Sequence, residues 1–594
     1  MNGRYRNSPI PLEDITGTIG TMILERAIEW PDHPVFAYRE QSGYVPVSWH
    51  ALLKDVVSIV NFLQTTGIKK RDRVAVLSPN SYAMLVWELA VTSMGSISVP
   101  IFAGYDAPHI DYILNHAEPI AIFINGEERL SRFEACSGRP AVKTVVTFHE
   151  SNYTRFNDCL NGNSSEKFFQ LVKKVMPEDV CFIQYTSGTT GDPKGVMLTH
   201  KNIISQRKAH EKTWTIPKGS RFLSYLPWHH SYGGLFERFT ALYHGAAIYL
   251  EDSLGKDIQR LISDWSIVMP THFFSVPRIY RALVIEARLN AEIKEILFHP
   301  ELKFIYTAAA PLPRDCGEYF NKHNIPVLEG WGLTETSPTV TMTSLDRPRI
   351  HSYVGDPLPG CEILTTEEGE ILVKGPNVMK GYYKDPVKTA NAIDHYGWLH
   401  TGDMGELTDY GLKLHYRRDG IFKLSNGEKV SSIVVENALT VSSDWINHGV
   451  VFGSGENYVG ALLFPNFRSL EEWAKRNNRT LPQEWELSKD KDIQALFQKE
   501  VDAGMSELEP SYLRVKAFVI IPHELTIENG CLTPSMKVVR HQVAQKYQDW
   551  IHAIFRPVKH PERVPYIVGS EVGGALFEKT APPSPPTKAF ERFL

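Results

Sequence analysis

Cysteine is scarce in this chain, and long apolar runs are missing. The 594 residues include six scattered cysteines without a C-x-x-C pair: Cys136, Cys159, Cys181, Cys316, Cys361 and Cys531. This pattern disfavours zinc and disulfide frameworks and favours a reducing, cytoplasmic compartment. No run of about 18 apolar residues occurs, so a membrane-spanning helix is not expected. The first twenty residues, MNGRYRNSPIPLEDITGTIG, lack the continuous apolar segment of a signal peptide.

An excess of positive charge is also missing. The 63 basic and 68 acidic residues give a formal net charge of −5, so a nucleic-acid partner is not expected. The hydrophobic content of 43% is typical of a globular enzyme, and the length exceeds what one core usually supports. Peripheral contact with the inner face of a membrane, and a homodimer, both stay open.

Apolar residues alternate along the chain between the spacing of a strand and the spacing of a helix, which predicts an α/β fold. The β-branched run RVAVLS (residues 73–78) precedes a helical stretch that ends at Gly95, and a second run, SISVPIF, follows. Strand, helix and strand in succession predict a layered sheet with parallel pairing. The strand pattern recurs at IAIFIN (120–125) and VCFIQYTSG (180–188), while short strands such as GEILVKG (369–375) predict a β-rich subdomain after Tyr306.

The chain is divided by these patterns into three parts. We expect a large N-terminal domain over residues 1–417, a small C-terminal domain over 418–560 and a proline-rich tail over 561–594. In the C-terminal part, GVVFGSGENYVGALLFPN is interpreted as two strands around a glycine turn, because its third glycine is misplaced for a dinucleotide fingerprint.

One loop carries the strongest chemical signal. YTSGTTGDPKGVMLTH (residues 185–200) places glycines, hydroxyls and a lysine directly after an apolar strand. Glycines let backbone N–H groups converge on an anion, and Lys194 adds a positive charge suited to a β- or γ-phosphate. The order of Lys194 and Gly195 differs from that of the usual nucleotide loop. The alternative is a glycine turn with an exposed lysine.

Other segments offer nucleotide and metal chemistry with less specificity. EGWGLTETSP (329–338) offers Trp331 as a purine-sized face, Thr334 as a phosphate donor and Glu335 as an oxygen ligand for Mg²⁺. GWLHTGDMGEL (397–407) reads as a buried strand ending in Gly402-Asp403, whose carboxylate can accept ribose hydroxyls. A helix cap and an Asx-turn are the respective alternatives.

Two further segments carry candidate site residues. LTPSMKVVR (532–540) places Lys537 after a proline-fixed turn, where a lone lysine is ordinarily a solvated residue. His229 and His230 in LPWHHSYGG lack a third ligand at metal spacing, so a wall of an aromatic-lined pocket is the preferred interpretation.

Taken together, these motifs resemble the adenylate-forming acyl-CoA synthetase superfamily. YTSGTTGDPKGV, GWGLTETSP, GWLHTGD, KLSNGEKV and LTPSMK occur in the order of that family, and the match extends from about Asp32 to Tyr547. FKLSNGEKV and TIENGCLTPSMK look most like the long-chain fatty acyl-CoA synthetase branch. The resemblance implies stacked α/β subdomains with a β-rich subdomain, and a small mobile α+β C-terminal domain.

The resemblance also implies a first half-reaction in which a fatty carboxylate attacks ATP to give acyl-AMP and pyrophosphate. Thr186 and Glu335 would hold Mg²⁺ and Lys537 would bridge the carboxylate and the α-phosphate; these three are the expected catalytic residues. The remaining ATP contacts would come from Ser187, Gly188, Thr189, Thr190, Lys194, Gly195, Trp331, Gly332, Thr334, Asp403 and Arg417, with Trp331 near adenine and with Asp403 and Arg417 at the ribose.

In the second half-reaction the thiol of coenzyme A replaces AMP. The resemblance implies that the C-terminal domain turns about a hinge at Asp419 and that Lys423, Ser425 and Gly427 line the coenzyme A channel. His230 aligns with a position beside the acyl carboxylate and is assigned to the acyl pocket and its gate.

Some positions depart from the family pattern, and alternatives remain. Tyr416 stands where an aspartate is usual, Gly420 replaces a charged residue and Trp331 replaces a tyrosine. A fatty acyl-AMP ligase and a medium-chain or aryl acid ligase share the fold. A catalytically silent nucleotide- or lipid-binding homologue is the alternative from a different class, against which the joint presence of Lys537, Glu335, Asp403 and Lys194 argues.

Overall fold

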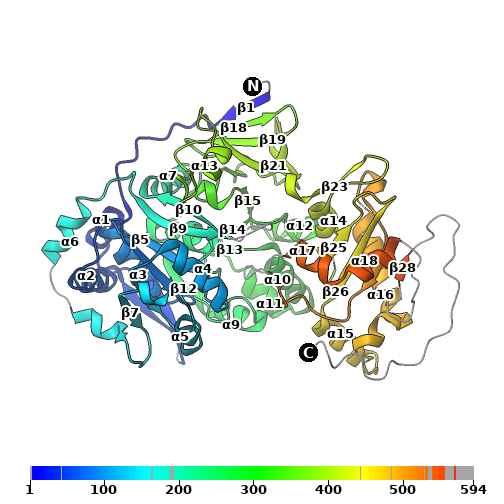
Figure 1. Ribbon diagram of the computed structural model, residues 1–594, viewed down its shortest axis with the longest axis horizontal. Coiled ribbons are helices and arrows are strands. Elements are labelled where there is room, and N and C mark those ends of the chain that lie inside the picture. Colours follow the sequence, from blue (N-terminus) through cyan, green and yellow to red (C-terminus); the bar gives the residue numbers. More distant parts are fainter. Residues whose placement is uncertain are drawn as a thin grey trace. The chain divides into compact units, whose positions relative to one another are not determined.

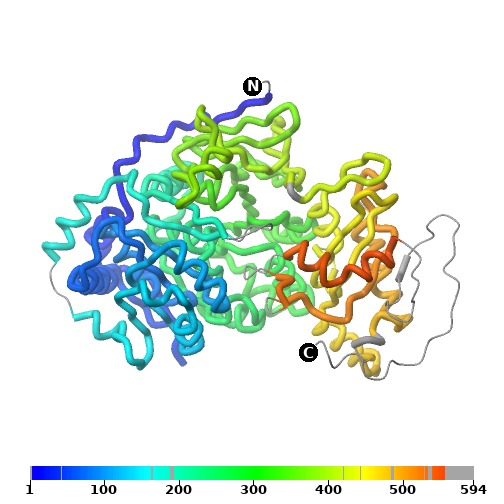
Figure 2. The backbone as a smooth tube through the Cα atoms, in the orientation of Figure 1, coloured from blue at the N-terminus to red at the C-terminus, as the bar shows by residue number. Residues whose placement is uncertain are grey.

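The computed structural model describes residues 3–41, 43–161, 165–186, 193–441, 443–482, 484–506, 508–526, 529–532, 538–555 and 567–569. The chain forms two compact units, which divide between His415 and Tyr416. Figure 2 traces the backbone. In the part of the chain that the structure describes, no helix combines the length and the apolar character needed to cross a membrane.

The first sheet of the large unit is mostly parallel, as the strand–helix–strand pattern predicts. Its strands lie in the order β20 (Gly381–Tyr382), β10 (Lys194–Thr199), β9 (Val180–Thr186), β5 (Ile97–Ile101), β4 (Arg73–Leu77), β6 (Ala121–Ile124), β7 (Thr144–Thr147) and β8 (Thr154–Arg155). β4 pairs in parallel with both β5 and β6, and β9 pairs in parallel with β5. The strands predicted in the runs 73–78, 96–102 and 120–125 are confirmed, and so is the run that begins at residue 180, over the described residues 180–186.

Alternate residues of β4 point to opposite faces of this sheet, as the two-residue period of a strand requires. Val74 and Val76 belong to one core, which also contains buried residues of α1 (Ile19–Glu29), α2 (Trp49–Thr65), α3 (Tyr82–Ser93) and α6 (Ser165–Val172). Ala75 and Leu77 belong to a second core with α4 (Ala107–Ala117) and α5 (Glu127–Glu134). Figure 1 shows α3 and α4 beside β5.

The second sheet shares the larger core. Its order is β17 (Asp356–Pro357), β16 (Thr341–Met342), β15 (Val327–Trp331), β14 (Phe304–Thr307), β13 (His272–Ser275), β11 (Arg221–Ser224), β12 (Ala247–Leu250), β2 (Pro34–Glu40) and β3 (Gly43–Ser48). The helices around it are α7 (His200–Glu211), α8 (Arg238–His244), α9 (Ile258–Val268), α10 (Pro277–Leu289), α11 (Ala291–Leu297) and α12 (Arg314–Lys322).

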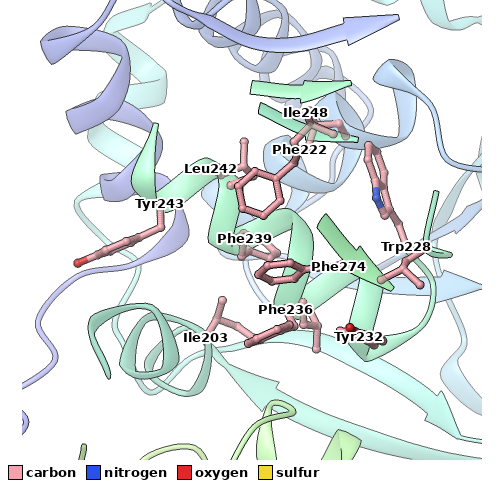
Figure 3. Packing of buried hydrophobic residues seen from close by; sticks show 14 of the residues in the cluster. Ile203, Phe222, Trp228, Tyr232, Phe236, Phe239, Leu242, Tyr243, Ile248 and Phe274 are labelled. Atoms are coloured by element: carbon pink, nitrogen blue, oxygen red, sulfur yellow. The ribbon is translucent and has the colours of Figure 1, made fainter. Parts of the chain in front are cut away.

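Aromatic rings fill the interior between this sheet and α8. Figure 3 shows Phe236, Phe239 and Phe274 close together, with Ile203 of α7 beside them. The rings of Phe236 and Phe274 are stacked with centroids 5.3 Å apart, and Tyr306 lies 4.7 Å from Phe236. The packing adds aromatic contact energy to the burial of apolar area and makes this part of the unit rigid.

A third, antiparallel sheet confirms the predicted β-rich subdomain. Its order is β1 (Gly3–Asn7), β18 (Glu362–Thr366), β19 (Glu370–Lys374), β21 (Leu399–Thr408) and β22 (Gly411–Arg417), and α13 (Pro386–Ala392) lies between β20 and β21 in the chain. β1 pairs with β18, so the first strand of the chain belongs to a sheet built from much later residues.

The second unit combines short sheets and helices. β23 (Ile421–Lys423) pairs with β24 (Lys429–Ser431), and the other sheet runs β25 (Ile446–Phe452), β26 (Val459–Pro465), β27 (Val515–Ile520) and β28 (Ile567–Gly569). β25 and β26 are antiparallel, which confirms the predicted hairpin around the glycine turn. β28 comes from residues that the sequence assigns to the tail. The helices are α14 (Ser432–Thr440), α15 (Phe467–Arg476), α16 (Lys491–Ser506), α17 (Arg540–Lys546) and α18 (Gln548–Phe555).

Candidate active site in the large unit

The glycine-rich loop connects two antiparallel strands. β9 ends at Thr186 and β10 begins at Lys194, and these two residues are paired in the register of the hairpin. The predicted strand leading into the loop is therefore confirmed, and the loop lysine is placed opposite the threonine expected at the metal. Ser187, Gly188, Thr189 and Thr190 lie outside the described residues.

Gly195 is required by close packing beneath the loop. A Cβ added there would lie 2.9 Å from the Cγ2 of Ile183 and 3.3 Å from the Cβ of Tyr383. The glycine of the motif therefore lets the hairpin and the segment after β20 approach each other. The Tyr383 backbone N–H donates to the Gly195 carbonyl at 2.7 Å, which fixes this approach.

Tyr382 brings the loop lysine and the expected metal ligand together. Its hydroxyl donates to Oε1 of Glu335 at 2.9 Å, and the Nζ of Lys194 lies 5.5 Å from the centre of its ring. β10 also packs against the 3-10 turn Thr334–Thr336, which carries Glu335. Lys194, Glu335 and Thr186 thus lie in one region of the large unit, Thr186 through its strand pairing with Lys194. The motifs gave no signal for Tyr382, whose role depends on a contact across the fold.

The turn that carries Glu335 is held on several sides. The Met379 N–H donates to the Glu335 carbonyl at 2.8 Å, and the Asn377 side chain donates to the Thr336 carbonyl at 3.1 Å. A Cβ on Gly332 would lie 1.7 Å from the Pro338 carbonyl oxygen, so only glycine fits there. These contacts fix the backbone of the turn and hold the Glu335 carboxylate in a defined position.

The expected adenine and ribose residues contact each other directly. The indole N–H of Trp331, at the end of β15, donates to Oδ2 of Asp403 at 2.8 Å, and both side chains are buried. Asp403 does not end a strand as the sequence predicts, nor does it form a turn between strands. It lies within β21, which continues to Thr408.

A bulge in β21 explains why the strand continues past Gly402 and Asp403. Glu370 and Leu372 of β19 pair with Met404 and His400, so β21 has extra residues between these pairs, and Gly402 has a φ of 71°. A bulge leaves the strand intact and changes the direction of nearby side chains, which is frequent beside active sites. A glycine is favoured at such a positive φ.

His230 is the N-cap of a π-helix, Ser231–Glu237, and its Nδ1 accepts from the Tyr232 N–H at 3.3 Å. The hydroxyls of Ser231 and Thr334 share a hydrogen bond of 3.1 Å, so the histidine segment and the Glu335 turn meet. π-helical turns are rare and frequent at functional sites.

Asn80, which follows β4, fixes the residues before His230. Its side-chain amide donates to the Leu226 carbonyl at 2.8 Å and its oxygen accepts from the Trp228 N–H at 2.8 Å. The neighbouring His229 ring lies 4.2 Å from that of Phe102. The two α/β halves therefore meet at this segment.

The remaining predicted residues belong to the second unit. Arg417 ends β22 and is exposed, and Asp419 lies in the 3-10 turn Arg418–Gly420. Lys423 ends β23, and Ser425 and Gly427 follow in the exposed loop before β24. The Ser425 hydroxyl donates to the Asn457 side chain at 2.6 Å. Lys537 lies outside the described residues.

Comparison with known proteins identifies the family. The family model described as AMP-binding enzyme matches residues 24–383, and that of the AMP-binding enzyme C-terminal domain matches residues 419–559. The first match alone covers more than half of the chain, so the chain belongs to the family of AMP-binding enzymes.

Individual relatives of this chain include acyl-CoA ligases. It is 26% identical to the long-chain-fatty-acid–CoA ligase FadD15 of Mycobacterium bovis, over 90% of this chain and 97% of the relative. It is 28% identical to the long-chain-fatty-acid–CoA ligase 1 of Cavia porcellus, over 82% of this chain and 78% of the relative. These matches confirm the resemblance stated from the motifs.

A solved structure shows the same fold. ATP-bound MatB from Rhodopseudomonas palustris superimposes with a TM-score of 0.72 at 22% identity, over 90% of this chain and all of MatB. The predicted α/β fold with a large N-terminal and a smaller C-terminal domain is confirmed.

Proposed function

We propose that this protein activates a long-chain fatty acid with ATP as acyl-AMP, releases pyrophosphate and transfers the acyl group to coenzyme A. The observation that supports this most strongly is the cluster of Lys194, Tyr382 and Glu335, in which Lys194 stands at one end of the hairpin loop and is paired to Thr186 at the other. The preference for long chains rests on the relatives, which are long-chain-fatty-acid–CoA ligases.

The first reaction must bring two anions together. Like charges at contact repel by several kcal/mol at intermediate dielectric, and phosphoryl-type transfer is accelerated mainly by positioned positive charge. Lys194 supplies such a charge beside the phosphate loop. In the proposal Lys537 supplies another, between the carboxylate and the α-phosphate, and Ser187–Gly195 hold the β- and γ-phosphates.

The residues of the site fit Mg²⁺. The Glu335 carboxylate and the Thr186 hydroxyl are hard oxygen donors, and the Tyr382 hydrogen bond orients the carboxylate as a neighbouring group does for a metal ligand. When bound, Mg²⁺ would neutralise part of the phosphate charge.

The same proposal places the rest of the nucleotide and the acid. Trp331 would lie near adenine, and Asp403 and Arg417 would hold the ribose, with Gly332 and Thr334 completing the ATP contacts. The hydrogen bond between Trp331 and Asp403 supports a common site for base and sugar. His230, fixed through Asn80 and the π-helix, would lie beside the acyl carboxylate.

For the thiol reaction we propose residues of the second unit. A turn of the domain that follows Arg417, about Asp419, would withdraw Lys537 and present the loop with Lys423, Ser425 and Gly427 to coenzyme A. An added Cβ on Gly427 would meet nothing within 4 Å, so the loop leaves open space at this residue.

The proposal is tested by ATP–pyrophosphate exchange with Mg²⁺ and acids from octanoate to arachidate, followed by addition of coenzyme A. We expect the fastest exchange with acids near palmitate in length, and acyl-CoA after addition of the thiol. Glu335→Gln should lose exchange, whereas Glu318→Gln, a surface residue of α12 paired with Arg314, should not. Exchange without acyl-CoA would indicate an acyl-AMP ligase, and exchange confined to short or aryl acids would remove the long-chain assignment.

A further inference from the structure

Helix α4 contacts both ends of the glycine-rich loop. The Tyr112 hydroxyl donates to the carbonyl of Pro193, directly before β10, at 3.1 Å. The Nδ1 of His116 lies 2.7 Å from the hydroxyl of Tyr185, one residue before the end of β9. One helix from outside the hairpin therefore holds the residues that flank the loop on either side.

The two contacts come from a single face of the helix. Tyr112 and His116 are four residues apart, the spacing that places side chains one above the other, and their rings are stacked at an angle of 7° with centroids 5.7 Å apart. The His116 ring also meets the rings of Tyr185 and Tyr383 edge-on, each at 5.7 Å. The four rings form one cluster beneath the hairpin.

The helix itself is firmly placed. Asp106 caps its N-terminus by accepting from the His109 N–H at 3.1 Å, and Ile110, Ile113 and Leu114 are buried in the core on the first sheet. A side chain on a capped, buried helix has little freedom to follow the loop. Movement of the loop ends therefore has to break the bonds to Tyr112 and His116.

The surroundings of His116 and Tyr185 keep both side chains uncharged at neutral pH. Burial and the charges of Lys384 and Lys388 lower the pKa of His116, although Asp385 and Glu118 oppose this. Burial, together with Tyr112 and Tyr383, raises the pKa of Tyr185 far above its usual value. At neutral pH the bond therefore joins an uncharged imidazole and an uncharged hydroxyl.

We propose that Tyr112 and His116 are positioning residues that fix the two ends of the glycine-rich loop and so set its affinity for the phosphates of ATP. They would act through Tyr185 and Pro193 without touching the nucleotide. The inference rests on the proposed function, because it assumes that this loop binds ATP.

The test measures equilibrium binding of Mg·ATP and the kinetic constants for ATP and fatty acid. His116→Phe keeps an aromatic ring and removes the ring nitrogens, and we expect its Kd and KM for ATP to rise about fivefold to tenfold, the factor for one lost hydrogen bond, with the KM for the acid unchanged. His116→Asn, which retains an acceptor near Nδ1, should recover part of this loss. His109→Phe is the matched control, since this histidine of α4 stacks on Tyr105 and contacts the capping Asp106, and so reports the effect of disturbing the helix away from the hairpin.

A double-mutant cycle separates positioning from general damage to the fold. Tyr185→Phe removes one oxygen from the other side of the bond, so the double variant with His116→Phe should bind ATP no more weakly than either single variant. Additive losses, or an unchanged Kd in both single variants of an active enzyme, would overturn the positioning role alone. A wild-type protein that binds no ATP would overturn both the inference and the proposed function.

Discussion

The hydroxyl of Tyr382 is the contact whose removal tests the proposed metal site most selectively. Tyr382→Phe deletes the donor that lies 2.9 Å from Oε1 of Glu335 and keeps the ring that faces Lys194. A hydrogen bond to a charged group contributes about 1.5–3 kcal/mol, and loss of a group that orients a metal ligand typically weakens metal binding by about 10–100-fold. Glu335 is only half-buried, so water can replace part of the lost bond, and we expect the lower end of this range.

The assay is a Mg²⁺ titration of pyrophosphate exchange at saturating ATP and acid. We expect the half-saturating concentration of free Mg²⁺ to rise about tenfold in Tyr382→Phe, with the maximal rate largely recovered at high Mg²⁺, because the ligand itself is still present. Tyr383→Phe is the control, since the structure of the described residues shows no hydrogen bond of its hydroxyl. An unchanged Mg²⁺ requirement in Tyr382→Phe, or the same increase in both variants, would refute the argument.

The remaining predictions concern the small unit and the pH dependence of stability. Lys537→Ala should slow adenylation about a hundredfold or more while leaving thioester formation from supplied acyl-AMP largely intact; equal loss in both half-reactions would be inconsistent with its role. Gly427→Trp should block the thiol step, whereas Gly427→Ala, which bears the same backbone strain at a φ of 88°, should retain most of it; acyl-CoA formation by the Trp variant at the normal rate would place the channel elsewhere. Burial lowers the pKa of His200 to about 3, and its Nδ1 accepts from the Ile19 N–H. In the unfolded chain His200 has a pKa of about 6.5 and is protonated below that pH, whereas in the folded protein it stays neutral. The free energy of unfolding is therefore highest above pH 6.5 and falls by about 2 kcal/mol between pH 7 and pH 5. His200→Asn should show a smaller decrease in the free energy of unfolding over that interval, measured by urea denaturation, and an equal decrease would contradict the assignment.

Local periodicity predicts the parts of this fold that depend on neighbours in sequence. The run at 73–78 forms β4, the helical stretch that follows it forms α3, and residues 180–186 form β9, because each pattern matches the geometry of one element. The pairing of β1 with β18 joins residues far apart in the chain, and no local pattern specifies it.

The site divides in the same way. In the motifs, the glycines and the lysine indicate the loop, and the carboxylates indicate Glu335 and Asp403, because these residue types suggest phosphate, metal and ribose binding. Tyr382 and His116 are ordinary residues of a strand and a helix in the sequence, and only tertiary contacts give them a role. The bulge at Gly402 also depends on pairing with β19. The sequence alone does not show this pairing, so its prediction of a strand end at Asp403 is wrong.

The central claim is that a carboxylate displaces pyrophosphate from ATP at the site built on Thr186, Lys194 and Glu335, and that the acyl group then passes to sulfur. The most direct measurement is phosphorus NMR with thioester quantification on purified protein supplied with Mg²⁺, ATP, palmitate and coenzyme A. The account predicts AMP, pyrophosphate and palmitoyl-CoA in equal amounts, with none of the three in Glu335→Gln. Formation of ADP and phosphate, or no turnover of ATP by the wild type, would contradict it.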